Sequence, residues 1–168
     1  LPDGRRQIAG FLVPGDYLGL ADDDVYSQSA EAVVPSVLCA FSTKEMDSLM
    51  ERFPRLKERL HQMTREALRT ARDNQLVLGR LAPVEKLASF LLVLGARTEK
   101  RGGKPNLVHL SMNRTDIADY LGLTIETVSR SFTKLKTQGL IHLLDANTVE
   151  ILSRRSLAAV AGMDPDAA

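Results

Sequence analysis

The segment from Thr124 to Gln138 constrains the fold of this chain most, because its residues divide between two sides of one predicted helix. Apolar side chains recur there at three- and four-residue spacing, which is the period of an amphipathic helix. The apolar side consists of Val128, Phe132 and Leu135, and the polar side of Glu126, Ser129, Arg130 and Thr133. Thr124 can cap the first turn with its hydroxyl. The pattern predicts a helix that packs on one side and leaves the other free for recognition.

A shorter amphipathic helix is predicted just before this segment. Residues 113–120 place Ile117 on an apolar side, and Gly122 can take the positive φ that a tight turn requires. Two helices joined by so short a turn predict a helix-turn-helix at about residues 114–138.

A hairpin is predicted directly after the second helix. Gly139 ends that helix, and residues 140–144 and 148–152 predict two strands joined by a turn at residues 145–147. Such a hairpin is the wing of a winged helix-turn-helix. The wing is therefore expected at about residues 140–152.

The polar side of the longer helix suits the edges of DNA bases. Arg130 can bond guanine O6 and N7, Glu126 can accept from cytosine N4, and Ser129 can adapt to either partner. Alternatively, Glu126 and Arg130 are four residues apart and form only a solvated helix pair. The turn and the wing favour DNA contact over that alternative. Further residues expected to contact the DNA backbone or to support the helix are Thr115, Thr124, Thr127, Thr133 and Lys134.

Charge and composition permit this interpretation and exclude several others. The 168 residues carry 22 Lys and Arg against 21 Asp and Glu, so the net charge is only +1. Positive charge is instead concentrated in the predicted contact helix, where the three cations Arg130, Lys134 and Lys136 outnumber the one acid, Glu126. No apolar run is long enough to span a membrane, and one Cys excludes an internal disulfide framework. With no signal peptide visible, the expected location is the cytoplasm.

A long helix is predicted from Pro54 to about Leu81, after a short one at residues 44–52. Its apolar positions form a narrow stripe flanked by charges, which favours a two-chain coiled coil and therefore a homodimer. Packing on the protein's own β domain is the alternative. The predicted dimer seam is Leu56, Leu60, Met63, Ala67, Ala71, Asn74 and Leu78. A symmetric dimer implies two palindromic half-sites about one DNA turn apart.

The first 42 residues have a β-like pattern. Residues 7–13, 29–34 and 37–41 predict strands, and Pro14-Gly15-Asp16 predicts a turn. They suggest part of a small antiparallel roll whose first strands are missing from the chain. The predicted organisation is a partial sensor roll at 1–42, a helical segment at 43–82 and a winged helix-turn-helix domain at 83–168.

The amino-acid sequences of several segments resemble those of the Crp/Fnr superfamily of transcription regulators, and specifically of its Fnr/FixK branch. The resemblance covers nearly the whole chain and is strongest in Pro2–Phe11, Pro14–Asp16, Ala82–Phe90 and Thr115–Arg130. It implies an α+β fold, with the C-terminal part of a cyclic-nucleotide-binding-like β-roll, a dimerisation helix and a winged helix-turn-helix. It also implies a double-stranded DNA partner, TTGAT-like half-sites contacted by Glu126, Ser129 and Arg130, and control of oxygen-limited metabolism.

Single positions separate this chain from cyclic-AMP-binding relatives. Crp-type proteins carry an Arg directly before the Glu of the contact helix, whereas this chain has Ile125 there, as Fnr-type proteins do. The phosphate of a cyclic nucleotide needs a cation or a nest of amides. Here Gly19 is followed by three acids at 22–24, and Gln28 stands where an Arg is expected. Cyclic AMP is therefore not the expected effector.

Cys39 has two interpretations. An isolated thiol is commonly a small core residue. In Fnr proteins, however, a Cys in a similar apolar context is the fourth ligand of a [4Fe-4S] cluster, and the other three precede the region seen here. Four thiolates are needed, so this chain alone cannot hold the cluster. The alternative is a Crp-like regulator that responds to another small effector or to thiol oxidation without a cluster.

An enzyme is not expected. The three His are scattered without metal-ligand spacing, and Gly103-Lys104-Pro105 lacks the flanking residues of a phosphate-binding loop. An activator would also need RNA polymerase as a partner, but no pattern marks a surface for it. The sequence leaves open the target genes, the choice between activation and repression, and the signal.

Overall fold

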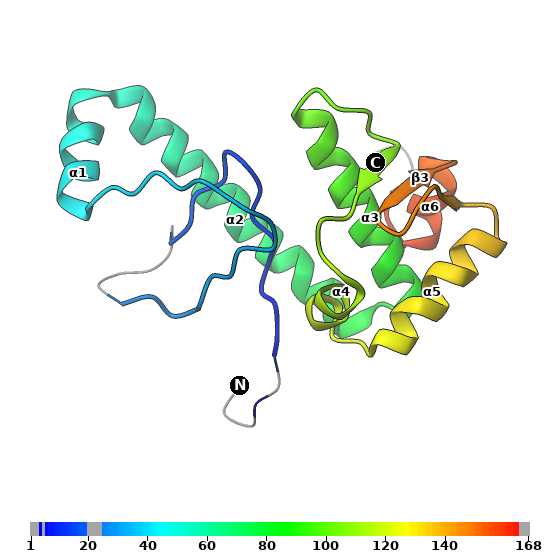
Figure 1. Cartoon of the computed structure of the whole chain (residues 1–168). Coiled ribbons are helices and arrows are strands. Elements are labelled where there is room, and N and C mark those ends of the chain that lie inside the picture. Colours follow the sequence, from blue (N-terminus) through cyan, green and yellow to red (C-terminus); the bar gives the residue numbers. More distant parts are fainter. Residues whose placement is uncertain (1–3, 5, 20–24, 165–168) are drawn as a thin grey trace. The chain divides into compact units, whose positions relative to one another are not determined.

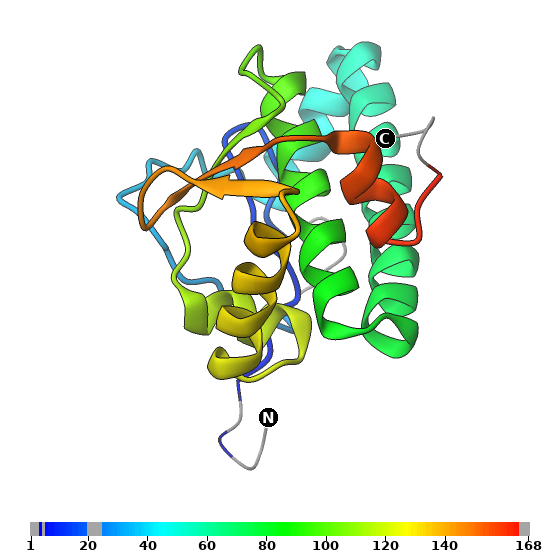
Figure 2. The same cartoon turned by 90° about the vertical axis from the view of Figure 1, so that its right-hand side faces the viewer.

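A computed structural model describes residues 4, 6–19 and 25–164 of the chain (Figures 1 and 2). Its elements, in chain order, are α1 (Thr43–Arg52), α2 (Pro54–Arg80), α3 (Pro83–Lys100), β1 (Leu107–His109), α4 (Arg114–Leu121), α5 (Ile125–Thr137), β2 (Ile141–Leu143), β3 (Thr148–Ile151) and α6 (Arg154–Val160). The chain divides into two compact units, Phe11–Gln75 and Leu1–Gly10 together with Leu76–Ala168.

The second unit, here called the winged unit, contains α3 to α6 and a small antiparallel sheet. The strand order is β1-β3-β2, so β3 is central, with Val149 opposite both Val108 and Leu143. The alternation along β3 turns Val149 and Ile151 inward. Figure 2 shows the sheet at one end of α5, with α6 against α3. The predicted hairpin is confirmed, whereas β1 and α6 were not predicted.

The core of the winged unit joins all of its elements. Its largest fully buried side chains come from each helix and strand in turn, so no element is held by one contact alone. They are Leu87, Leu91, Val108, Leu110, Ile117, Leu121, Val128, Leu135, Ile141, Val149, Ile151 and Leu157. A dense aliphatic core of this kind fixes the position of α5 relative to the sheet.

Helix α3 is longer than its sequence pattern predicts. Residues 84–94 carry the apolar pattern of a helix, and the helix continues beyond that pattern to Lys100. Gly95 permits the close approach of the extended helix to the Pro105 carbonyl, because a Cβ at this position would lie 2.5 Å from its oxygen. Basic residues in the last turn of α3 also favour the negative helix end. The loop thus begins only after Lys100.

The strands predicted for residues 7–13, 29–34 and 37–41 are not formed in this structure. The described residues between 6 and 42 are turns, bends and irregular chain. A strand requires a neighbour to complete its ladder of hydrogen bonds, and the described part of this region supplies none. The predicted turn is present, since the Asp16 N–H donates to the Val13 carbonyl at 2.9 Å. The prediction failed because side-chain alternation indicates β propensity, not a pairing partner.

The two helices of the first unit begin and end close to the predicted residues. Ser42 caps α1 by accepting from the Glu45 N–H, while the Glu45 carboxylate accepts from the Ser42 N–H at 2.9 Å. Pro54 begins α2, where a missing N–H costs nothing. No residue of α2 is buried. Within the described ranges, none of the helices has the length and apolar character to cross a bilayer.

Candidate nucleic-acid interface

Helix α5 forms where the sequence predicts and presents the predicted sides. The Thr124 hydroxyl accepts from the Thr127 N–H at 3.2 Å, which fixes the start of the helix. Val128, Phe132 and Leu135 are buried. The opposite side is left to solvent, as an interaction surface requires.

The turn before α5 is fixed from two directions. Gly122 adopts φ +62°, the left-handed conformation that ends α4, and its N–H donates to the Ala118 carbonyl. From α3, the buried Lys86 donates its ammonium to the Leu121 carbonyl at 3.2 Å. A cation at the C-terminal end of a helix also interacts favourably with the helix dipole. Lys86, a residue that no sequence pattern marks, therefore helps to hold the two helices of the motif in place.

The three predicted base-contacting residues lie together on the open side of α5. Glu126, Ser129 and Arg130 are all exposed, and three- or four-residue spacing places them on adjacent turns. Hydrogen bonds from the backbone N–H of Glu126 and from the Thr124 hydroxyl lower the pKa of the Glu126 carboxyl, with a smaller contribution from the charge of Arg130. Glu126 is therefore an anion at neutral pH, and it can accept from a base amino group.

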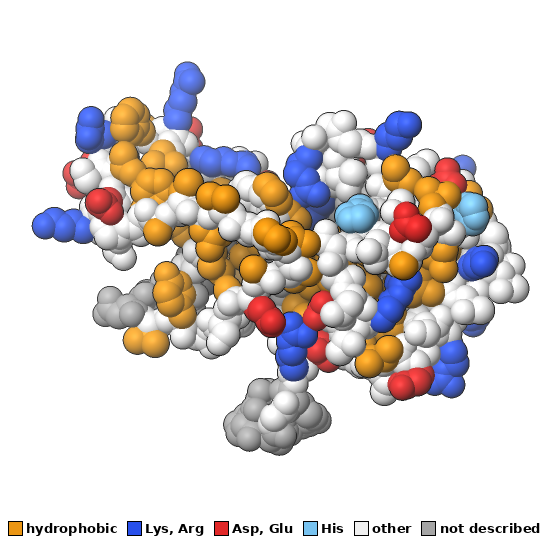
Figure 3. Space-filling view, in the orientation of Figure 1, with side chains coloured by type: hydrophobic (Ala, Val, Ile, Leu, Met, Phe, Trp, Pro, Cys, Tyr) orange, Lys and Arg blue, Asp and Glu red, His pale blue; other side chains and the backbone are white. Residues whose placement is uncertain are grey.

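Glu126 and Arg130 are not locked to each other. The ion pairs within the described residues do not include one between them, although their charges interact at longer range. In the solvated-pair alternative, the Glu126 carboxylate and the Arg130 guanidinium would bind each other. In this structure they do not, so both groups are available to other partners. In Figure 3, separate Lys and Arg side chains lie on the α5 part of the surface, with other side chains between them.

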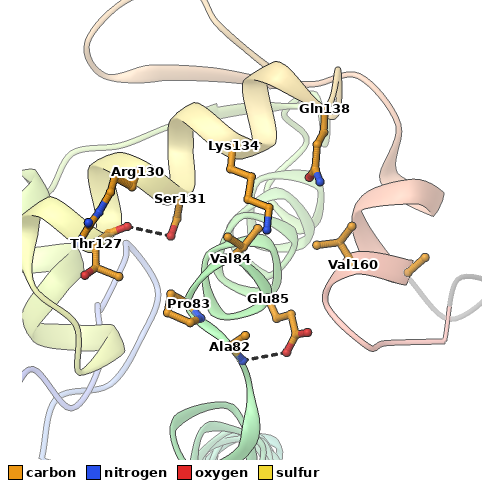
Figure 4. Close-up of a pocket in the computed structure, with 11 residues that line it drawn as sticks. Ala82, Pro83, Val84, Glu85, Thr127, Arg130, Ser131, Lys134, Gln138 and Val160 are labelled. Carbon is orange, nitrogen blue, oxygen red and sulfur yellow. Dashed lines mark hydrogen bonds between the residues drawn. The ribbon is translucent and has the colours of Figure 1, made fainter.

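One flank of α5 lines a groove of about 540 Å³. Thr127, Arg130, Ser131, Lys134 and Gln138 face the first turn of α3 and the end of α6 across it. Figure 4 shows Lys134 and Gln138 extending from α5 toward the start of α3. Lys134 thus lies beside the predicted base-contacting side, where a DNA backbone would pass a helix inserted in a major groove.

The other predicted supporting residues have different roles in the structure. Thr115 is exposed at the second position of α4. Thr127 is half-buried, and its hydroxyl and that of Thr124 lie 3.0 Å apart. The Thr133 hydroxyl donates to the Ser129 carbonyl one turn earlier. Thr115 and Thr133 are both exposed, although the Thr133 hydroxyl already donates within α5, whereas Thr124 and Thr127 stabilise the start of α5.

The wing ends in an acidic tip. The Asp145 carboxylate accepts from the Asn147 N–H at 2.7 Å, and this bond, with a smaller contribution from the Thr148 hydroxyl, lowers the pKa of the Asp145 carboxyl. Residues 144–148 contain no Lys or Arg. The tip therefore carries negative charge and does not favour a phosphate. The cations available to a DNA backbone lie on the helices instead.

Cys39 lies outside the winged unit, and so do all residues of the predicted seam except Leu78. Cys39 is exposed, which argues against the core-residue interpretation in this structure. It is the only Cys in the chain, and among the described residues no group of three His, Cys, Asp or Glu could hold a metal. These residues do not by themselves fit a [4Fe-4S] cluster, which needs four thiolates. Within the seam, Leu56, Leu60, Met63 and Asn74 are half-buried, and Ala67, Ala71 and Leu78 are exposed.

Comparisons with known proteins agree with this geometry. The profile of the Crp-like helix-turn-helix domain matches residues 85–160. The chain is 44% identical over 160 residues to the nitrogen fixation regulation protein FixK of Bradyrhizobium diazoefficiens, covering 91% of this chain and 68% of that protein. It is 42% identical to the transcriptional activatory protein AadR of Rhodopseudomonas palustris, covering 96% and 67%.

The solved structure of FixK2 from Bradyrhizobium japonicum has the same fold. The two structures superpose with a TM-score of 0.76 at 33% identity, over 95% of this chain and 79% of that one. Sequence and fold therefore agree on one assignment. The chain belongs to the Crp/Fnr family of DNA-binding transcription regulators, and its relatives are regulators of the FixK and Fnr type.

Proposed function

We propose that this chain is a dimeric, cytoplasmic transcription activator of the Fnr/FixK type that binds TTGAT-like palindromic half-sites and controls metabolism under oxygen limitation. The observation that carries the proposal is the exposed set on α5, in which Glu126, Ser129 and Arg130 share one side of a firmly packed helix. The activity of relatives named as activators and nitrogen fixation regulators supports it.

Each base-contacting residue has a distinct expected role. The Arg130 guanidinium bonds the guanine of the half-site through O6 and N7, and the Glu126 carboxylate accepts from a cytosine amino group. Ser129 contacts the neighbouring base edge. Thr115, Thr133 and Lys134 contact the phosphates on either side, while Thr124 and Thr127 hold the start of α5 in the groove.

The dimer is expected to form along α2. This helix is 27 residues long and has no buried residue, so the described chain covers its apolar stripe only in part. A second copy would cover the seam from Leu56 to Leu78 and place two winged domains on a palindrome.

Binding of the full chain to two DNA duplexes tests the proposal. One duplex carries a palindrome of TTGAT half-sites, and the other has the same composition in scrambled order. Wild-type protein should prefer the palindrome. Arg130→Ala should cost about 1 to 3 kcal/mol and remove discrimination at the guanine position. The measurement is fluorescence anisotropy at a fixed salt concentration.

Lys136→Ala is the matched control for that experiment. Lys136 is also an exposed cation of α5, but it lies outside the base-contacting set and the groove. Its removal should leave the preference for the palindrome intact. Equal loss of affinity for both duplexes in Arg130→Ala would show that Arg130 contacts only the backbone.

Thiol oxidation remains a second candidate for the signal, because the Cys39 thiol is exposed and accessible to oxidants. Peroxide should then change operator binding by wild-type protein and not by Cys39→Ser. An identical response in both proteins would exclude this route.

A further inference from the structure

Helix α4 ends with carbonyl groups that other parts of the chain must satisfy. The last four carbonyls of an α-helix have no partner within the helix itself. In α4, the Ala118 carbonyl accepts from the N–H groups of the turn before α5, and the Leu121 carbonyl accepts from the Lys86 ammonium. The carbonyls of Asp119 and Tyr120 are left for a different segment of the chain.

The segment of residues 6–8, here called the strap, supplies both of these partners. The Ile8 N–H donates to the Asp119 carbonyl and the Gln7 side-chain amide donates to the Tyr120 carbonyl, each at 3.3 Å. Gln7 and Tyr120 are 113 positions apart in the sequence. In Figures 1 and 2 the N-terminal segment passes beside α4. The strap belongs to the winged unit, although it lies outside the part of the chain that the helix-turn-helix profile matches.

Arg6 adds to the strap an ion pair with a carboxylate that is nearly buried. Its Nη1 atom lies 2.6 Å from Asp116 Oδ1 and 3.3 Å from Asp119 Oδ2. The Asp116 side chain is only 10% exposed, and its Oδ2 atom accepts from the Asn113 N–H in the capping box of α4. Loss of one partner from a buried ion pair leaves an uncompensated charge, which is strongly destabilising. The strap therefore holds α4 at both its first and its last turn.

The position of α4 determines where α5 begins. Helix α4 has eight residues, which is too short for a helix to be stable without contacts from the rest of the protein. Its first residue, Arg114, stacks its guanidinium carbon 3.5 Å from the centre of the Phe132 ring, on the buried side of α5. Its last turn leads through Gly122 to Thr124, the N-cap of α5. A shift or fraying of α4 would therefore move the first turn of α5, which carries Glu126.

We infer that the strap positions the helix-turn-helix for DNA recognition, with Arg6 as a positioning residue that fixes α4 through Asp116. The inference rests on the proposed function and deepens it, because sequence-specific binding then requires residues outside the helix-turn-helix domain. Molecules in which the strap is released bind DNA poorly, so the apparent affinity falls with the fraction that keeps α4 in place. The chain continues from the strap into the other unit at Phe11. A rearrangement of that unit that withdraws the strap therefore weakens DNA binding.

Arg6→Met in the full chain tests the positioning role, because it keeps the apolar stem and removes the charge. Binding is measured with the palindromic and scrambled duplexes, at a temperature at which circular dichroism shows a fully folded variant. Affinity for the palindrome should fall on the order of tenfold. Affinity for the scrambled duplex depends mainly on charge and should change by less than about twofold. The slope of log affinity against log salt should stay the same, since Arg6 bonds α4 and not the DNA.

A double-mutant cycle tests whether Arg6 acts through Asp116. Asp116→Asn can keep the bond from the Asn113 N–H and removes the charge that Arg6 neutralises. In that background, Arg6→Met should cost less than about threefold in affinity for the palindrome, because the two contributions are coupled. A full tenfold loss in the double variant would contradict the inference. If Arg6→Met does not fold, Gln7→Leu removes only the bond to Tyr120 and should lower affinity for the palindrome about two- to threefold.

Ile151→Val is the control for an effect of stability alone. Ile151 is 1% exposed, and the loss of one methyl group from the core of the winged unit should lower the melting temperature by several degrees. The ratio of the two affinities should not change in this variant. If Arg6→Met also lowers the melting temperature and leaves that ratio at the wild-type value, Arg6 has only a structural role and the inference is wrong.

The remaining outcomes separate this inference from the proposed function. A salt slope that becomes shallower by about 0.9 for each protomer in Arg6→Met would show that Arg6 binds a phosphate directly, which contradicts the positioning role alone. A wild-type protein without any preference for the palindrome would overturn the proposed function, and this inference with it.

Discussion

Helices α2 and α3 are both long and amphipathic, but they differ in what covers their apolar sides. Eight residues of α3 are buried, and its two most buried leucines, Leu87 and Leu91, are fully enclosed. Helix α2 is nine residues longer, since it has 27 residues against 18, and none of them is buried. Periodicity therefore identifies a helix with an apolar side in both cases. Only the contacts made by the rest of the chain decide whether that side is already satisfied.

The largest expected effect is a difference in stability between Leu→Ala variants of α3 and α2. Leu91→Ala should lower the free energy of unfolding by about 2 to 5 kcal/mol, because it leaves a cavity in a closed core. Leu76→Ala on α2 removes the same atoms from a side chain that is 66% exposed, and should change it by less than about 0.5 kcal/mol. Urea unfolding of both variants makes the measurement. Similar losses would mean that α2 is covered in solution.

The next prediction tests what covers α2. Leu60→Asp places a charge in the proposed seam and should raise the dissociation constant of the dimer about 100-fold or more, which is at least about 2.8 kcal/mol. Leu68→Asp is the control, because Leu68 is 53% exposed and lies outside the seam. Sedimentation should show a folded monomer only for Leu60→Asp. An unchanged dimer mass would place the interface elsewhere.

Two helical glycines provide a third comparison, because replacing each by Ala should change the free energy of unfolding in opposite directions. Gly95→Ala in α3 pushes a methyl group against the Pro105 carbonyl oxygen and should lower the free energy of unfolding by about 1 to 2 kcal/mol. Gly79→Ala in α2 meets no atom within 4 Å and should raise it by about 0.5 to 1 kcal/mol through helix propensity. Thermal and urea unfolding give both values. Stabilisation by Gly95→Ala would show that the loop after α3 yields easily.

Local signals predicted the helix-turn-helix well. The Thr124 cap, the positive φ of Gly122 and the buried side of α5 each depend on residues within a few positions of one another. Such features are determined by local geometry and survive in the folded structure. The polar set on α5 is exposed for the same reason, since it lies opposite the residues that pack.

Other features depend on residues that are far apart in the sequence. Strand β1 has only three residues, and its partner β3 begins about forty residues later, so its pattern is too short to be recognised. The stack of Arg114 on Phe132 depends on how α4 crosses α5. The prediction of strands before residue 42 was wrong for the opposite reason. The residues there have β propensity, but the described part of that region contains no neighbouring strand to pair with.

The smallest expected effect compares the N-terminal turns of α5 and α1. The pKa of Glu126 is lowered mainly by its own N–H and the Thr124 hydroxyl, and that of Glu45 mainly by the Ser42 hydroxyl and N–H. A lowered pKa in the folded state means that the stabilisation is complete above the ordinary Glu value of about 4.3 and is lost as the pH falls below it.

Glu126→Gln and Glu45→Gln should therefore each slightly reduce stability at pH 7 and flatten its decline between about pH 5 and 3. Both side chains are exposed, so each effect is small and close to the limit of a urea titration followed by circular dichroism. Lys136→Ala should leave the acid limb unchanged. If Glu126→Gln kept the full acid dependence, the Thr124 and backbone bonds would not hold the Glu126 carboxylate in solution, and Glu126 would reach the DNA from a mobile first turn of α5.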